Sequence, residues 1–127
     1  MHKINTALSP NVIGPYSQGI RISNFIFTSA QLPINPNDGL MPSDIINQTT
    51  QALYNIKYIV EEGNSHLNKI IKITIFLKNL DDMNDVNTTY KKFFDQNNVI
   101  IYPARSCIEV QRLPKNSSIQ IEAIAII

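Results

Sequence analysis

An arginine and a cysteine stand two residues apart in the segment Y-P-A-R-S-C-I-E-V, residues 102–110. Pro103 marks the start of a β-rich segment, and residues two apart in a strand point to the same face, so Arg105 and Cys107 are predicted to share one surface. A guanidinium fork matches a carboxylate in shape and charge. Arg105 is therefore a candidate clamp for a small organic acid, although a salt bridge at the surface or at an interface would explain it equally well.

Three further polar side chains stand at the ends or on one face of apolar elements. Tyr16 follows a Gly-Pro pair and could present its phenol to a pocket, whereas Ser29 ends a predicted strand. Asn87 lies between Val86 and Tyr90 in a helical pattern, on the side expected to be buried, where an amide needs a hydrogen-bond partner. Each of these residues, taken alone, is more often structural than functional.

Cys107 as a nucleophile would need a nearby base, and neither His2 nor His66 lies in a suitable segment. We therefore interpret Cys107 as a small packing residue. In the last predicted strand, Gln120 and Glu122 stand two apart, hence on one face and roughly 7 Å from each other.

Several familiar catalytic devices are missing from the chain. The four glycines form no phosphate-binding loop, and the two histidines are not in ligand spacing with Cys107. No Gly-x-Ser-x-Gly motif of a serine hydrolase occurs. We expect neither a metal nor a nucleotide cofactor.

The composition favours one domain over residues 1–127 that has part of its surface covered by a partner subunit. Charged residues make up only 17% of the chain and hydrophobic residues 43%, against roughly a quarter charged in ordinary globular proteins. The formal charge is +1 and the basic residues are scattered, which argues against a nucleic-acid partner. One cysteine allows no internal disulfide, and no apolar stretch suits a secretory signal or a membrane span. A reducing cytoplasm is the expected compartment.

The hydrophobic periodicity predicts an α+β domain with the order ββ, long loop, α, β, α, β, β. The pattern predicts two helices on one face of the sheet. The other face then carries strands too apolar to meet water, so we expect self-association through it. The predicted elements are a hairpin over 18–30, a loop over 33–42, a helix from the cap Ser43 to the stop Gly63, a strand over 70–77, a helix from Met83 to about 97, and strands over 105–110 and 118–126.

Several motifs together make the chain similar to the reactive intermediate deaminase (Rid) family over nearly its whole length. They are I-G-P-Y-S-Q-G (13–19), T-S-A-Q-L-P (28–33), V-N-T-T-Y (86–90), Y-P-A-R-S-C (102–107) and I-Q-I-E-A-I-A (119–125). The resemblance implies a chorismate-mutase-like fold with a mixed sheet, and a homotrimer with ligand sites between subunits. It also implies hydrolysis of 2-iminopropanoate and 2-iminobutanoate to 2-keto acids and ammonia, without a cofactor.

The resemblance assigns roles to particular residues. Arg105 would hold the substrate carboxylate with help from Ser29, while Tyr16, Asn87 and Cys107 would line the cleft, some of them from the neighbouring chain. Where the family usually has a glutamate that orients or deprotonates the attacking water, this chain has Gln120. The predicted catalytic set is Arg105, Gln120 and Tyr16.

The exchange of glutamate for glutamine leaves two main functional interpretations open. Gln120 keeps hydrogen-bonding groups but cannot accept a proton at neutral pH, and loss of a general base typically costs a factor of about 10² to 10⁴ in rate. The chain is either a slow trimeric deaminase in which Gln120 positions water, or a non-catalytic trimer that binds small carboxylates. The ribonuclease or translation-inhibitor activity attributed to some relatives is the least supported, because the chain has no basic stripe.

Overall fold

The computed structural model describes residues 1–127 and contains six strands, two α-helices and three short 3-10 helices. The buried residues of the two long helices recur at helical spacing, as the sequence predicts. The elements are β1 (His2–Ile4), β2 (Gly19–Ile22), β3 (Phe25–Thr28), α1 (Ile45–Glu62), η1 (Leu67–Lys69), β4 (Ile70–Leu77), η2 (Leu80–Asp82), α2 (Met83–Gln96), β5 (Ala104–Glu109), η3 (Pro114–Asn116) and β6 (Ile119–Ile126).

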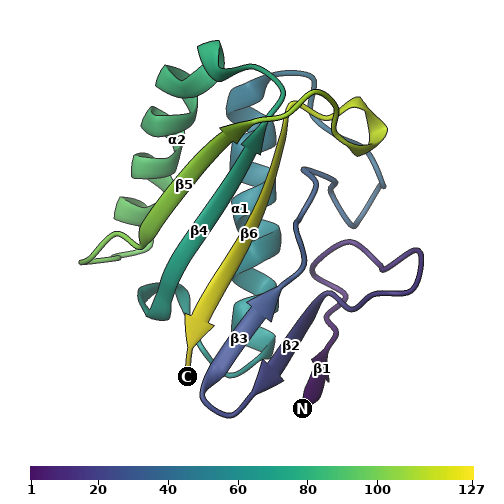
Figure 1. Ribbon diagram of the computed structural model, residues 1–127, viewed down its shortest axis with the longest axis vertical. Coiled ribbons are helices and arrows are strands. Elements are labelled where there is room, and N and C mark those ends of the chain that lie inside the picture. The colour runs from purple at the N-terminus through teal and green to yellow at the C-terminus, as the bar shows by residue number, and fades with distance from the viewer.

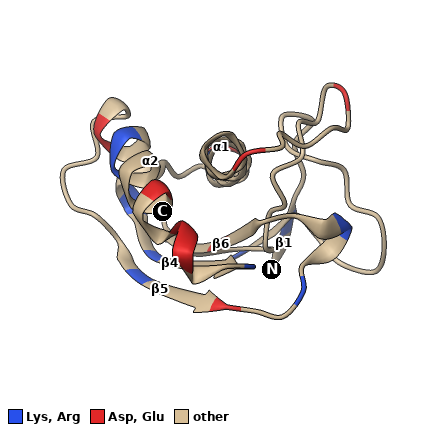
Figure 2. Cartoon of the chain, turned by 90° about the horizontal axis from the view of Figure 1, so that it is seen from above, with Lys and Arg blue, Asp and Glu red and all other residues tan.

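All six strands belong to one sheet in the order β1-β2-β3-β6-β4-β5. The pairs are antiparallel except for β4 and β5, which run parallel and are connected through α2. Both long helices cover the same face of this mixed sheet, and the opposite face has no covering layer (Figures 1 and 2). The predicted α+β architecture is confirmed.

The core lies between the helices and the covered face of the sheet. In β6 the alternate residues Ile119, Ile121, Ala123 and Ala125 are buried and point toward the helices. The residues between them are less buried and point to the open face. This period of two decides on which face every functional side chain of the sheet lies.

Both predicted ends of α1 shift by one residue. Asp44, rather than Ser43, is the N-cap, because its carboxylate accepts a hydrogen bond from the Asn47 N–H at 2.9 Å. Gly63 is the C-cap with a φ of −76°, and Asn64 takes the left-handed conformation with a φ of 66°. A Cβ at position 63 would lie 2.5 Å from Cδ1 of the fully buried Ile26, so the Ile26 side chain would have to shift to admit a larger residue there.

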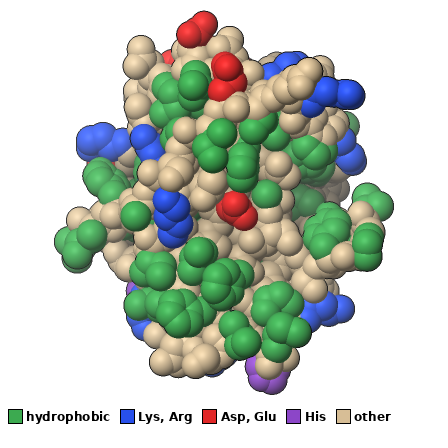
Figure 3. Space-filling view, in the orientation of Figure 1, with side chains coloured by type: hydrophobic (Ala, Val, Ile, Leu, Met, Phe, Trp, Pro, Cys, Tyr) green, Lys and Arg blue, Asp and Glu red, His purple; other side chains and the backbone are tan.

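The open face of the sheet is largely apolar. Phe25, Phe27 and Ile126 are 42%, 43% and 37% exposed there, on the adjacent strands β3 and β6. Figure 3 looks onto this face and shows hydrophobic side chains gathered over the sheet, with basic and acidic side chains near its middle. The Lys72 ammonium donates a hydrogen bond to the Ser106 hydroxyl at 2.7 Å. An apolar face of this kind is typical of an interface between subunits.

None of the helices has the length and apolar character that crossing a membrane requires.

Candidate active site

Three of the sequence-predicted residues, Tyr16, Ser29 and Gln120, line one cavity of about 480 Å³. This volume lies within the range of small-molecule sites. The wall combines the loop before β2, the segment after β3, the turn around η3 and the start of β6, which lie on the same side of the molecule (Figure 1). No acidic side chain lines the cavity, whereas Lys115 does, so the cavity suits an anion.

The buried Gln18 holds the loop that forms one wall of this cavity. Its amide oxygen accepts a hydrogen bond from the Thr6 N–H at 2.7 Å, and its amide nitrogen donates to the carbonyls of Thr6 and Pro10 at 3.0 and 2.9 Å. A side chain that bridges the backbone in this way replaces the hydrogen bonds of regular structure in a loop. Gln18 therefore serves the architecture of the cavity.

The Gln120 side chain, in contrast, makes no hydrogen bond within the chain, and the residue is half-buried. An amide offers two donors and one acceptor oxygen, and all of them remain available to a ligand or a water molecule. The Ser29 hydroxyl donates to the Ser17 carbonyl at 2.5 Å, so it retains only acceptor capacity for a ligand in this arrangement. Tyr16 is 53% exposed and its phenol is free.

Arg105 and Cys107 lie on β5 and face α2, as expected for residues two apart in one strand. The Arg105 Cζ lies 4.9 Å from the centroid of the Tyr90 ring on α2. Burial raises the pKa of the Cys107 thiol, and the nearby Arg105 charge only partly offsets this. The thiol is therefore neutral at physiological pH, in agreement with a packing residue rather than a nucleophile.

Asn87 lies on the exposed surface of α2, so the prediction that it points to the buried side is wrong. The buried stripe of α2 runs through Val86, Thr89, Tyr90 and Phe93, and residue 87 falls beside it. The Asn87 amide makes no hydrogen bond within the chain, and it stands one helical turn before Tyr90. On the helix it is therefore a neighbour of Tyr90, the residue that Arg105 contacts.

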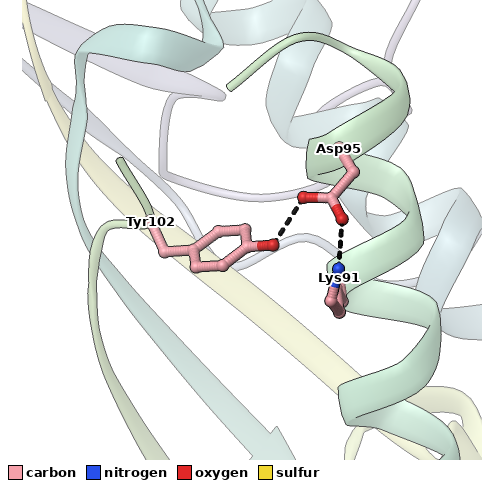
Figure 4. A network of polar contacts seen from close by, with 3 residues as sticks. All are labelled: Lys91, Asp95 and Tyr102. Atoms are coloured by element: carbon pink, nitrogen blue, oxygen red, sulfur yellow. Dashed lines mark hydrogen bonds and ion pairs between the residues drawn. The ribbon is translucent and has the colours of Figure 1, made fainter. Parts of the chain in front are cut away.

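A network of exposed polar side chains connects α2 with the loop that enters β5 (Figure 4). Lys91 donates a hydrogen bond to one oxygen of the Asp95 carboxylate, and Tyr102 donates one to the other oxygen. The hydrogen bond from Lys91, followed by that from Tyr102, lowers the pKa of Asp95. Because Tyr102 stands three residues before Arg105, this contact helps to fix the approach of β5 to α2.

The structure thus divides the predicted residues into two groups, which we name the cavity half (Tyr16, Ser29 and Gln120) and the arginine half (Asn87, Arg105 and Cys107). Gln120 points to the open face of the sheet, whereas Arg105 points to the face that the helices cover. Gln120 is opposite Phe76 on β4, which in turn is opposite Ile108 on β5, so two strand spacings, about 10 Å, separate the two strands. The two halves of one chain cannot enclose the same small ligand.

Three features near these groups could not be recognised from the sequence alone. Lys115 lines the cavity from a turn with a positive φ of 55°, where the sequence indicates only a surface turn. The backbone N–H of Ala30, also in the wall, donates to no acceptor within the chain. Tyr90 looks like an ordinary core position in a helical stripe, and only the packed structure places it against Arg105.

Solved structures with the same fold identify the class of protein. The YjgF gene product of Escherichia coli superimposes with a TM-score of 0.97 and 46% identity over 99% of this chain and 98% of that one. Escherichia coli TdcF with bound serine also superimposes with a TM-score of 0.97, at 41% identity over 100% and 99% of the two chains. The chain therefore has the chorismate-mutase-like fold of YjgF and Rid proteins.

Sequence comparison leads to the family itself. The profile of the family described as Endoribonuclease L-PSP matches residues 6–127. The 2-iminobutanoate/2-iminopropanoate deaminase of Escherichia coli strain K12 is 48% identical over 123 residues, which cover 97% of this chain and 95% of that protein. A RutC family protein of Pasteurella multocida is 47% identical with the same coverage. The chain belongs to this family, and its resemblance to the Rid proteins is confirmed.

Proposed function

We propose that this chain is a hydrolase that deaminates small 2-imino acids, such as 2-iminobutanoate and 2-iminopropanoate, to 2-keto acids and ammonia. The observation that carries the proposal is the complementary pair of half-sites, a cationic fork on one face and a cavity with a free amide on the other, in a chain 48% identical to a 2-iminobutanoate/2-iminopropanoate deaminase. Residues 1–127 act as one domain in this proposal, and the expected compartment is the cytoplasm.

A homotrimer would complete the site. In a closed ring of identical chains, each interface brings two different surfaces of the chain together, so the arginine half of one chain can meet the cavity half of the next. The apolar open face of the sheet supplies the surface that such an assembly buries. Light scattering is expected to give about three times the chain mass of 14.4 kDa, and a monomer at micromolar concentration would contradict this assembly.

In the proposed reaction, the Arg105 guanidinium binds the substrate carboxylate with two parallel hydrogen bonds. Gln120 and Tyr16 orient a water molecule toward C2 of the imine. The water oxygen bonds to C2, the C=N double bond becomes a single bond, and one water proton passes to the nitrogen to give a carbinolamine. The carbinolamine hydroxyl then gives its proton to the amine, which leaves as ammonia while C2 and the oxygen form the carbonyl of the 2-keto acid. Because Gln120 cannot take a proton, acceleration comes from binding and orientation, which are worth several orders of magnitude in favourable cases.

The matching test generates 2-iminopropanoate in solution with a serine dehydratase and follows its disappearance with and without the protein. Faster loss of the imine with the protein, and no acceleration with Arg105→Ala, is the expected result. The same rate with and without the protein would overturn the enzymatic proposal.

A second function, non-catalytic binding of small carboxylates, is favoured by one observation, the amide at Gln120 in place of a carboxylate. In that case calorimetry would detect binding of 2-ketobutyrate, while the imine would disappear at its spontaneous rate. Cleavage of RNA, which the family's description suggests, finds less support: the net charge is +1 and Lys and Arg are spread over the molecule (Figure 2).

A further inference from the structure

Arg105 lacks the partners that usually hold an arginine side chain in place. The two ion pairs within the chain join Lys57 to Glu61 and Lys91 to Asp95, and neither involves Arg105. No hydrogen bond connects its guanidinium to another part of the chain. The contact that remains is aromatic, because the Arg105 Cζ lies 4.9 Å from the centroid of the Tyr90 ring. At this distance a guanidinium is attracted to the face of an aromatic ring.

The Tyr90 ring is a rigid support. Tyr90 is only 5% exposed, and its centroid lies 4.6 Å from that of Phe94, which is fully buried one helical turn later. A ring packed in this way cannot change its rotamer without disturbing the core. The guanidinium is therefore held against a surface that belongs to the interior of the protein, although Arg105 itself is exposed.

The hydroxyl of Tyr90 does not contribute to this arrangement through hydrogen bonding. It is buried and has no hydrogen-bond partner, so it lowers the stability of the fold rather than raising it. Burial raises the pKa of Tyr90 to about 12, the Arg105 charge lowering it only in part. The phenol thus stays neutral at physiological pH and leaves the positive charge of Arg105 intact.

We propose that Tyr90 is a positioning residue, whose ring face holds the Arg105 guanidinium so that its donors remain free for the carboxylate of a small ligand. A carboxylate side chain could orient Arg105 equally well, but it would consume the charge and two or more of the five N–H donors. An aromatic ring orients the guanidinium and leaves its N–H donors free to bind the ligand. The inference rests on the proposed function of Arg105 as the carboxylate clamp.

Titration with 2-ketobutyrate tests this role in four variants of the full-length protein. Tyr90→Leu is expected to weaken binding about 5-fold, the scale of one partly desolvated cation–π contact, and to raise KM for the imine while kcat changes little. Tyr90→Phe keeps the ring and is expected to bind within about 2-fold of the parent, since both rings attract cations. Arg105→Ala defines the full contribution of the clamp, and Tyr90→Leu added to Arg105→Ala is expected to weaken binding no further.

A fifth variant separates the electrostatics of the ring from its shape. Pentafluorophenylalanine at position 90 has nearly the size of phenylalanine but an electron-poor face, so it is expected to bind 2-ketobutyrate more weakly than Tyr90→Phe. This comparison decides the proposal even when Tyr90→Leu does not fold. Thermal denaturation of each variant shows whether the altered affinity is independent of stability.

Three results would overturn the inference. If Arg105→Ala weakens binding but Tyr90→Leu or the fluorinated ring does not, Arg105 binds the carboxylate but Tyr90 does not position it. If Tyr90→Phe loses as much affinity as Tyr90→Leu, the hydroxyl rather than the ring is responsible. If Arg105→Ala binds as well as the parent, the carboxylate clamp and the role of Tyr90 both fall.

Discussion

The cavity half and the arginine half of the candidate site are built in opposite ways. The cavity half is concave and neutral apart from Lys115, and loops held by buried side chains such as Gln18 form its walls. The arginine half is a single charged side chain that stands out from an edge strand against the ring of Tyr90. The cavity half thus provides a concave surface but not the Arg105 charge, whereas the arginine half provides that charge but no cavity.

This difference indicates why the chain would need partners to act. Arg105 and Gln120 point to opposite faces of one sheet, and no rotamer change moves a side chain through a packed sheet. A neighbouring chain that covers the open face can supply the missing half. Recognition of the ligand carboxylate and placement of the attacking water would then come from different chains, so each function can be removed separately.

Mixing of inactive variants gives the largest expected effect. Arg105→Ala removes the arginine half, and Tyr16→Ala combined with Gln120→Leu removes the cavity half. Each protein is expected to lose at least about 100-fold in imine turnover because positioning is lost. After joint dissociation and reassembly in equal amounts, about one quarter of the interfaces combine two intact halves, so about a quarter of the parent rate should return. A mixture as inactive as its components would place the whole site within one chain.

Restoring a carboxylate in the cavity half is expected to raise turnover. Gln120→Glu should increase kcat by about 10-fold or more, the lower edge of what a positioned base contributes, and change the affinity for 2-ketobutyrate little. Its rate should also rise with pH as the new carboxyl ionises around its ordinary pKa of about 4.3. The parent protein, which has an amide there, should lack this limb of the profile.

Two results would argue against residue 120 as the site of the base: no gain in rate with Gln120→Glu, and loss of the residual rate with Glu122→Gln. If Gln120→Glu is no faster and the parent already matches its relatives, a general base is not needed in this cleft. The control is Glu122→Gln, on the same strand face beside Thr74. An unchanged rate assigns Glu122 to packing or to an interface, whereas loss of the residual rate would identify it as the base.

Replacement of the fork by a point charge gives a smaller effect in the arginine half. Arg105→Lys keeps the positive charge but cannot form two parallel hydrogen bonds with a carboxylate, so binding of 2-ketobutyrate should weaken about 10-fold, as expected for loss of one charge-assisted hydrogen bond. Calorimetric titration measures this directly. Equal affinity would show that Arg105 acts through charge alone or has a structural role.

The smallest effect concerns Cys107. Burial raises the pKa of its thiol, and only the thiolate reacts with alkylating agents. The pH at which alkylation by iodoacetamide reaches half its maximal rate should therefore lie above that of an unfolded control, and reaction at pH 8 should be slower. Arg105→Ala should raise this midpoint further, because the guanidinium partly stabilises the thiolate. A midpoint at or below that of the unfolded control would indicate an activated cysteine.

Local sequence was sufficient for most elements of the fold. Apolar residues at helical spacing predicted α1 and α2, and the β-branched run over residues 70–77 predicted β4 with its bounds as observed. Periodicity reports only which face of an element is apolar, so details that depend on a single hydrogen bond or a close contact were missed. Asp44 rather than Ser43 caps α1, Gly63 packs closely against Ile26, and β1 is too short for a periodic signal.

For the candidate site, the sequence by itself determined the residue types and which residues of one strand lie on the same face. Spacing predicted that Arg105 and Cys107 share a face and that Gln120 and Glu122 share a face, whereas the resemblance to the Rid family indicated that Gln120 stands where a glutamate is usual. Only the tertiary structure decided that these faces are opposite, that Asn87 is exposed and that Tyr90 lies against Arg105. The physical reason is that strand order and helix placement arise from contacts between residues far apart in the chain, which the spacing of neighbouring residues does not encode.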